Sequence, residues 1–409
     1  MGVQYAILRK NKQSYTAMKR IKKYFYHDLV VLIPIMRKPR AIVSVTNDLY
    51  TDQRVDKVCN FLVDRGYDVL LVGRNRKNSL KLLERNYRMH RMHLFFDKGA
   101  LFYAEYNLRL FFFLLVRKAA IFVSNDLDTL LANYTAKVVK PGTRLYYDSH
   151  EYFTEVPELQ GRGAKKVWEK IEGFIFPKLK TIYTVNESIA EMYRKKYGKE
   201  IFVVRNVSPL WNGIQLEGKT ELGLPEDRPV IIMQGAGINI DRGGEEAVEA
   251  MKYVENACLA IVGDGDVVPQ LKTYVEQNGL QEKVLFFGKQ PYQRMMNYTY
   301  HATIGLTLDK DTNINYRFSL PNKLFDYIHT NTAVICTPLV EVKRIVEEYA
   351  VGCVLQTLTP EKLAATINKL LFDTQKLDEI CENCEQAKQV LNWENETEVL
   401  KKIYPKVEQ

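Results

Sequence analysis

Lys323 and Asp326 lie one helical turn apart in the stretch "SLPNKLFDYIHT", residues 319–330, just before an apolar run. A helix N-terminus and a lysine ammonium can together hold an anion, and a neighbouring carboxylate can accept hydrogen bonds from hydroxyl groups. These are the groups that a phosphorylated, hydroxyl-bearing ligand needs. Taken alone, the segment favours a simpler interpretation, an exposed ion pair that contributes little to stability.

The spacing of this stretch predicts a helix over residues 322–330 with two faces. The apolar face carries Leu324, Phe325 and Ile328. The other face carries Lys323, Asp326 and Tyr327. These three residues share one side of the helix, since they lie three and four positions apart. We expect that side, opposite the apolar face, to remain open. Ser319 or Asn322 can cap the helix, and Pro321 suits its first turn.

Apolar runs that alternate with helical stretches predict two successive α/β units with parallel sheets. The first unit has predicted strands at 41–46, 68–73, 121–126, 145–150, 181–186 and 202–206. The second has predicted strands at 229–235, 257–263, 283–288, 302–308, 333–337 and 351–355. The sequence therefore indicates two Rossmann-like domains. Because ligands bind at the carboxyl ends of parallel strands, we expect the domains to face an interdomain cleft.

The expected organisation has five parts. These are an N-terminal arm (1–40), a first Rossmann-like domain (41–207), a linker (208–228), a second Rossmann-like domain (229–390) and a closing helical segment (391–409). The linker contains Gly and Pro and has no clear period, which is typical of a connection between two units.

Four strand-end loops of the second unit carry glycine or polar residues. The first loop begins at Gly235 and ends at Arg242, the second begins at Gly263, and the third contains Gln290. Glycine lets the backbone approach a ligand closely. Together with Lys323 in the fourth loop, Arg242 is placed where a diphosphate could bind, and we assign Asn322 to the same donor site.

Several common nucleotide-binding and metal-binding motifs are absent. Neither first strand is followed by G-x-G-x-x-G, and the chain has no Walker lysine motif and no D-x-D. Cys381 and Cys384 have no second cysteine pair and no histidine near them in the sequence. We therefore interpret them as free thiols rather than as ligands of a zinc site. We expect no metal and no cofactor, with cations and helix dipoles handling the diphosphate.

The first unit offers a smaller set of polar side chains. Its first strand-end loop contributes Asn47, Asp48 and Arg54, and a later one contributes His150. On its own His150 is better explained as a core or capping histidine.

Six motifs appear in order along the chain. They are "NDLYTDQR", "DSHEYFTE", "QGAGINIDRG", "VGDGD", "VLFFG" and "LPNKLFDY". The series resembles bacterial family 4 glycosyltransferases of the GT-B fold, from about residue 41 to residue 405. The resemblance implies a metal-free, retaining transfer of a sugar from a nucleotide-sugar donor.

The resemblance also implies roles for individual residues. Arg242 matches the basic residue of the phosphate motif, and Lys323 lies in the phosphate-binding stretch. Asp326 matches the second acid of an E-x7-E motif that holds the donor ribose. His150 is similar to the histidine that lines the donor sugar, and Gln290 lies where family members contact the base.

Two positions depart from the family pattern. Phe318 stands where the first acid of E-x7-E is expected, and Ala236 stands where a second phosphate cation is expected. Lys323 or Arg54 would have to replace that cation. Two alternatives to a glycosyltransferase therefore stay open: a nucleotide-sugar 2-epimerase of the same fold, and a non-catalytic, membrane-bound subunit that binds a nucleotide sugar.

The charge is concentrated in the arm. Residues 1–40 hold ten Lys/Arg and one acid, a net +9 that equals the formal charge of the whole chain. Interleaved aromatic residues favour an anionic membrane surface over nucleic acid as the partner. The stretch 98–118 predicts a Phe- and Leu-rich helix that could also reach a membrane, although a core helix would explain part of its composition.

No apolar run approaches the roughly 20 residues that span a bilayer. Free thiols suit a reducing compartment, so we expect a cytoplasmic protein, held by its basic arm at the inner face of the plasma membrane. It would transfer a sugar to a lipid-linked or glycan acceptor in cell-surface polysaccharide or glycolipid synthesis.

Overall fold

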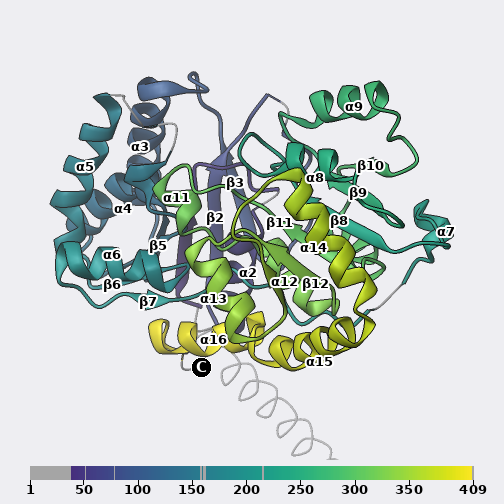
Figure 1. Cartoon of the computed structure of the whole chain (residues 1–409). Coiled ribbons are helices and arrows are strands. Elements are labelled where there is room, and N and C mark those ends of the chain that lie inside the picture. Colours follow the sequence, from purple (N-terminus) through teal and green to yellow (C-terminus); the bar gives the residue numbers. More distant parts are fainter. Residues whose placement is uncertain are drawn as a thin grey trace, which may run out of the picture.

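The computed structural model describes residues 38–407, apart from residues 51, 78, 157, 158, 160–162, 214 and 215. Two parallel sheets, of seven and six strands, form the centres of two α/β units (Figure 1). This confirms the predicted fold class. The arm expected over residues 1–40 lies outside the described residues, except for its last three.

The first sheet has the strand order β3-β2-β1-β4-β5-β6-β7. Its strands are β1 (Arg40–Ser44), β2 (Asp68–Arg74), β3 (Arg88–Met92), β4 (Ile121–Asn125), β5 (Arg144–Ser149), β6 (Thr181–Thr184) and β7 (Phe202–Val203). All strand pairs are parallel. Strand β3 was not predicted, because "RMHRM" has no apolar run. As an edge strand that pairs only with β2, it does not need one.

The second sheet has the strand order β10-β9-β8-β11-β12-β13. Its strands are β8 (Val230–Gly235), β9 (Cys258–Gly263), β10 (Val284–Gly288), β11 (Ile304–Thr307), β12 (Ala333–Cys336) and β13 (Gly352–Val354). The strands are short and apolar, and most of their residues are buried. Continuous apolar runs are what a parallel sheet covered on both faces requires.

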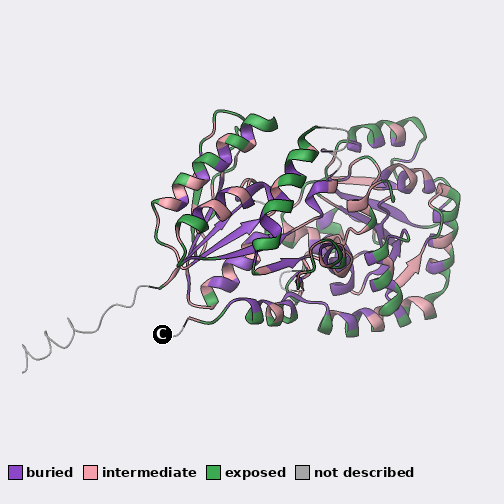
Figure 2. Cartoon of the chain, turned by 90° about the vertical axis from the view of Figure 1, so that its left-hand side faces the viewer, coloured by how far each residue is buried: buried purple, intermediate pink, exposed green. Residues whose placement is uncertain are grey.

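Helices cover both sheets, with exposed outer faces and buried inner faces (Figure 2). In the first unit they are α2 (Gln53–Asp64), α3 (Gly99–Leu115), α4 (Leu127–Val139), α5 (Gly163–Ile175) and α6 (Glu187–Tyr197). In the second unit they are α7 (Lys219–Leu222), α8 (Gly244–Ala250), α9 (Val268–Gln277), α10 (Tyr292–Tyr300), α11 (Ile314–Arg317), α12 (Asn322–His329), α13 (Val340–Glu348), α14 (Pro360–Phe372) and α15 (Thr374–Val390).

The C-terminal helix α16 (Trp393–Ile403) packs against the first sheet rather than the second. The Tyr404 hydroxyl lies 3.0 Å from that of Tyr183 in β6, and the Val407 amide donates to the Arg65 carbonyl at 3.0 Å. Burial of Leu400 and Tyr404 in the first core stabilises this return of the chain.

The helix expected over residues 322–330 is α12, but its second face is not open. Tyr327 is fully buried, and its hydroxyl donates to the Leu306 carbonyl in β11 at 3.1 Å. A Cβ at Gly305 would lie 2.5 Å from the Tyr327 ring, so glycine makes room for this contact. The predicted side-chain cap is also wrong, because Pro321 occupies the N-cap and no side chain bonds there.

Helix α3 corresponds to the Phe- and Leu-rich stretch 98–118. One side of it belongs to the core, with Phe102, Tyr106, Leu110 and Leu114 buried. The other side leaves Leu101, Leu108 and Phe112 more than half exposed. None of the helices among the described residues has the length and apolar character to cross a membrane.

Candidate active site

The topology marks one point in the second sheet as the natural ligand site. The strand order reverses between β8 and β11, and parallel sheets bind ligands at the carboxyl ends flanking such a reversal. Arg242 follows β8 and Asp309 follows β11, and Arg242 Nη1 donates to Asp309 Oδ2 at 2.9 Å. The Lys310 amide also donates to the Asp241 carbonyl at 2.8 Å, which joins the two loops.

Lys323, in the first turn of α12, is the second cation at this point. Burial lowers the pKa of Lys323, as does the charge of Arg242, while the carboxylate of Asp309 acts to raise it. The Tyr316 ring lies against the Arg242 guanidinium, with the ring centroid 4.3 Å from Cζ. Two cations thus share one buried carboxylate, which leaves excess positive charge for an anion. We call Arg242, Asp309 and Lys323 the cation cluster.

Three polar atoms in and beside the cation cluster are buried and have no hydrogen-bond partner among the described residues. They are Arg242 Nε, Asp309 Oδ1 and Ser319 Oγ. Ser319 is tied to the cluster through its amide, which donates to the Tyr316 carbonyl at 3.1 Å. Buried polar atoms are nearly always paired, so this unpaired set suits a ligand that carries both acceptors and donors.

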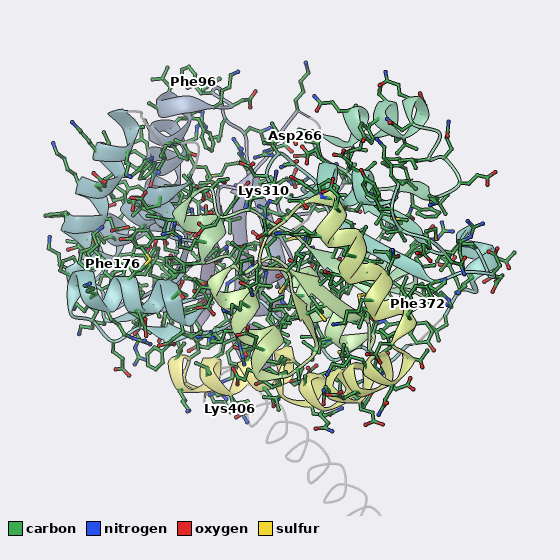
Figure 3. The ribbon with its side chains drawn as sticks, in the orientation of Figure 1. Phe96, Phe176, Asp266, Lys310, Phe372 and Lys406 are labelled. Atoms are coloured by element: carbon green, nitrogen blue, oxygen red, sulfur yellow. The ribbon has the colours of Figure 1, made fainter. Side chains whose placement is uncertain are left out.

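The glycine loops lie on the same edge of the sheet. Asp266 lies in the loop after β9, and Lys310 follows β11. Figure 3 shows both residues towards the junction between the two units. Gly235 and Gly263 have φ values of +140° and +148°, which side chains rarely adopt. A Cβ at Gly263 would lie 1.9 Å from the Gly235 carbonyl oxygen, so the two loops touch backbone to backbone.

Gly263→Ala should therefore destabilise the protein and abolish ligand binding at this edge, because the new Cβ cannot fit without moving the Gly235 loop. Gly279→Ala is the matched control. Gly279 also has a positive φ of +66°, but nothing lies within 4 Å of its Cβ position. Thermal unfolding and nucleotide binding should show a loss for Gly263→Ala that is much larger than the ~1 kcal/mol expected for the control. Equal losses would contradict the close approach.

The sequence predicted that Asp326 faces an open site. The structure contradicts this prediction, because Asp326 is only 2% exposed. Its Oδ1 accepts hydrogen bonds from Ser208 at 2.8 Å and Tyr292 at 3.0 Å, and its Oδ2 accepts one from Gln234 at 2.9 Å. Burial raises its pKa to about 6, although these donors oppose the shift. A ribose diol could reach the carboxylate only by replacing one of the present donors.

Gln290 and Asn322 are the two remaining donor-site residues of the second unit. Gln290 Nε2 donates to the Phe287 carbonyl at 2.7 Å, which holds this side chain against its own loop. Asn322 begins α12 and is partly exposed, one residue before Lys323.

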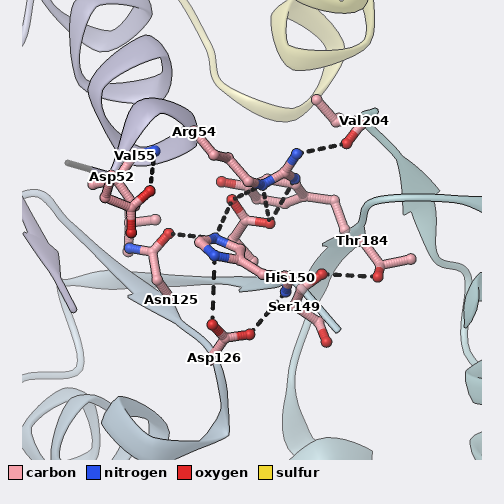
Figure 4. A network of polar contacts seen from close by, with 12 residues as sticks. Asp52, Arg54, Val55, Asn125, Asp126, Ser149, His150, Thr184 and Val204 are labelled. Atoms are coloured by element: carbon pink, nitrogen blue, oxygen red, sulfur yellow. Dashed lines mark hydrogen bonds and ion pairs between the residues drawn. The ribbon is translucent and has the colours of Figure 1, made fainter. Parts of the chain in front are cut away.

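In the first unit, His150 lies between two carboxylates at the ends of β4 and β5 (Figure 4). Its Nδ1 is 3.4 Å from Asp126 and its Nε2 is 3.3 Å from Asp148. The Asn125 amide oxygen lies 3.1 Å from Nε2. Asp126 has a positive φ of 56°, an uncommon backbone conformation outside glycine that is often found at functional sites.

These carboxylates determine the charge on His150. Burial acts to lower the pKa of His150, but the charges of Asp126 and Asp148 outweigh it and raise the pKa to about 9. Burial also acts to raise the pKa of Asp148, but the charges of Arg54 and His150 outweigh it and lower that pKa. At neutral pH the site therefore holds an imidazolium that can donate but cannot accept a proton.

His150 should titrate well above the usual range, near pH 9, in an NMR titration of its ring protons. Since the folded pKa exceeds the unfolded value of ~6.5, the stabilisation is complete below about pH 6.5 and is lost as pH rises through about 9. The free energy of unfolding should fall by on the order of 3 kcal/mol across that window in the wild type, and not in His150→Gln. A His150 pKa near 6.5 would contradict the two-carboxylate environment.

Arg54 was one of two residues predicted to replace the missing phosphate cation. In the structure it is not available for that role. Its guanidinium is 3% exposed and makes a bidentate pair with Asp148, at 2.7 and 3.0 Å. Its Nη1 donates to the Val204 carbonyl at 2.8 Å. Asp48 is likewise engaged, with Arg91 and Ser79, whereas Asn47 remains largely exposed.

The two units touch near these strand ends. Asn315 Oδ1, in α11, accepts a hydrogen bond from the Tyr152 amide at 3.1 Å, and Asn186 donates to the Phe318 carbonyl at 2.7 Å. Phe318 also packs against the core of the first unit. This contact gives a physical reason for an apolar side chain where the family pattern has an acid. Ala236 is exposed, so Arg242 is the cation that this loop supplies.

Two carboxylates that complete the site, Asp309 and Asp126, were not predicted from the sequence. Each follows a strand next to the reversal in its sheet, β11 in one case and β4 in the other. Knowledge of the strand order would have pointed to both residues. A sequence alone does not give the order of the strands within a sheet. Among the described residues, no group of three or more His, Cys, Asp or Glu side chains has an arrangement that could hold a metal ion.

Comparison with known proteins identifies the second unit. Residues 215–389 match the family model described as Glycosyl transferases group 1. The second unit is therefore similar to group 1 glycosyltransferases. The matched segment contains the whole cation cluster. Among curated proteins, none matches this chain at a significant level.

Solved structures extend the likeness in fold to both units. Sucrose-phosphate synthase from Thermosynechococcus elongatus is 17% identical, with a TM-score of 0.71 over 90% of this chain and 98% of that one. WaaG, a glycosyltransferase involved in lipopolysaccharide biosynthesis, is 14% identical, with a TM-score of 0.70 over 89% and 100%. Anabaena HepE in complex with UDP-glucose is 14% identical, with a TM-score of 0.68 over 89% and 99%. At these identities the likeness shows the GT-B fold alone.

Proposed function

We propose that the protein is a glycosyltransferase that moves a sugar from a nucleotide-diphosphate donor to a lipid-linked or glycan acceptor, with retention of anomeric configuration. The second domain (229–390) would bind the donor, and the first domain (41–207) would bind the acceptor. The observation that carries this proposal is the cation cluster, with its excess charge and its unpaired Arg242 Nε and Asp309 Oδ1. Such a set matches a diphosphate attached to a sugar.

The reaction would break the bond between the anomeric carbon and the terminal phosphate oxygen, and the bonding electrons would remain on that oxygen. Arg242 and Lys323 would stabilise the negative charge that develops there, which is the largest electrostatic demand of the step. The acceptor hydroxyl would form the new bond on the same face of the sugar, and its proton would pass to the departing phosphate oxygen. No separate protein base is needed.

His150 would not serve as that base, because its pKa of about 9 keeps it protonated. It would instead present an imidazolium edge towards a sugar hydroxyl at the strand ends of the first unit. Asp309 Oδ1, buried and without a partner, would accept a hydrogen bond from another hydroxyl of the donor. It could thereby replace the carboxylate that the family pattern places at the position of Phe318. Asp326 would hold the ribose by exchanging the Tyr292 hydroxyl for a ribose hydroxyl.

The proposed place of work is the inner face of the plasma membrane, in cell-surface polysaccharide or glycolipid synthesis. The basic arm (1–40) would supply electrostatic attraction to anionic lipid. Exposed Leu108 and Phe112 on α3 would add apolar contact. The solved relative WaaG, involved in lipopolysaccharide biosynthesis, supports such a pathway by analogy of fold.

Incubation with nucleotide sugars and a lipid-linked acceptor tests this function. We expect transfer, with an unchanged rate in EDTA, because two side-chain cations and not a metal neutralise the diphosphate. UDP-glucose is a reasonable first donor, since it is bound by HepE. An isomerised donor without transfer would identify a 2-epimerase. Binding without turnover would identify a non-catalytic subunit, the alternative that Phe318 and Ala236 favour. Strict dependence on Mg²⁺ or Mn²⁺ would contradict the mechanism.

A further inference from the structure

A cavity of about 1020 Å³ lies at the opposite edge of the first sheet from His150, among the residues that begin its strands. Arg40, Asp68 and Arg88, which line it, are the first residues of β1, β2 and β3. The loop 116–120, between α3 and β4, closes another side. The candidate active site lies at the carboxyl ends of the strands, so this cavity belongs to a different region.

The lining of the cavity is strongly basic. Its cations are Lys38, Arg40, Arg85, Arg88, Arg117 and Lys118, and its only acid is Asp68. Asp68 is shared between Arg40, at 3.1 Å, and Arg88, at 2.6 Å.

Three cations of the lining have no counter-ion among the described residues. Within the part of the chain that the structure describes, no carboxylate forms an ion pair with Lys38, Arg117 or Lys118, whereas Arg85 pairs with Asp56 at 3.0 Å. Burial lowers the pKa of Arg117, and the charge of Arg40 adds to the effect. Like charges gathered around one hollow repel one another, so an anion inside it would relieve that repulsion.

An apolar strip adjoins the cavity directly. Val116 lines the cavity and is 78% exposed, and it follows the last residue of α3. Phe112 and Leu108 lie one and two turns earlier on the same side of α3, and are 56% and 59% exposed. A cationic hollow bordered by exposed apolar side chains matches the boundary between the headgroups and the acyl chains of a lipid layer.

We propose that this cavity binds the phosphate headgroup of an anionic phospholipid, with Leu108, Phe112 and Val116 in contact with the upper acyl region. The arm that precedes Lys38 is itself strongly basic, so charge argues against the arm as the occupant. The site deepens the proposed membrane association and assigns it to residues of the folded domain. Its position at the amino ends of the strands leaves the carboxyl-end active site free for donor and acceptor.

The test is sedimentation of the full chain with vesicles of equal parts phosphatidylglycerol and phosphatidylcholine. Lys38→Glu with Lys118→Glu should reduce binding at least tenfold, because each lysine near an anionic surface contributes about 1 kcal/mol. Both lysines are exposed and form no ion pair within the described part of the chain, so folding should be unaffected. The matched control is Lys272→Glu with Lys362→Glu, two exposed lysines on α9 and α14 of the other domain, with the same change in net charge. We expect the control to lose less than about threefold.

Two further arms separate a lipid headgroup from a soluble phosphate. Phe112→Ser with Leu108→Ser should also reduce vesicle binding, and inorganic phosphate at matched ionic strength should not displace the protein from vesicles. Equal losses in the test and control pairs, or displacement by inorganic phosphate with no effect of the serine variants, would overturn the proposal. Sedimentation requires no turnover, so its result is independent of whether the proposed transfer reaction is correct.

Discussion

Arg242→Ala should lower kcat for sugar transfer by roughly 10²–10³-fold, with a smaller effect on the KM for the donor. The charge on the terminal phosphate increases as the glycosidic bond breaks, so a cation that faces it stabilises the transition state more than the bound donor. Removing Arg242 also leaves the buried Asp309 facing Lys323 alone, which would draw the remaining cation away from the ligand.

Two variants serve as controls for Arg242→Ala. Arg242→Lys keeps the charge but loses the planar, bidentate geometry, so we expect an intermediate rate. Arg317→Ala removes an arginine of α11 whose side chain is 50% exposed and paired with Asp311, and its rate should be close to that of the wild type. Near-normal turnover of Arg242→Ala would mean that the diphosphate binds elsewhere.

Asp148→Asn should cost about 3–5 kcal/mol of unfolding free energy, the second large effect that the structure predicts. The substitution removes the counter-ion of Arg54, which is 3% exposed and cannot turn to solvent. It also removes one of the two carboxylates that hold the imidazolium of His150. Urea unfolding monitored by circular dichroism gives the free energy directly.

Asp311→Asn is the matched control for Asp148→Asn. It makes the same chemical change in the pair with Arg317, where both side chains are about half exposed, and exposed pairs contribute at most about 1 kcal/mol. If the two variants lose the same stability, the buried network around Arg54 does not stabilise the first domain as proposed.

The fold was predictable because its signals are local. Each apolar run that was predicted as a strand became a strand of one of the two parallel sheets, since strands covered on both faces need apolar residues at nearly every position. The charged edge strand β3 carries no such signal and was missed. Helix α12 was predicted at nearly its observed limits, but its environment was not, because Tyr327 is buried by contact with β11, a strand that precedes it in the chain.

The candidate site was predictable only in part. Arg242 and Lys323 could be brought together from the sequence because both follow strands of one parallel sheet, and their loops must share an edge. The role of Arg54 could not be predicted, because its partner Asp148 is 94 residues away and only the folded chain brings the two together. Asp309 was missed for a related reason: its place beside β8 depends on strand order, which a single chain does not reveal.

The most direct test of the central claim, that the cation cluster binds the donor diphosphate, is a crystal structure of the protein with UDP or GDP. We predict that the diphosphate oxygens lie within about 3 Å of Arg242 Nε and Lys323 Nζ, the distance of a charge-assisted hydrogen bond. A diphosphate bound away from Arg242 and Lys323 would contradict the account.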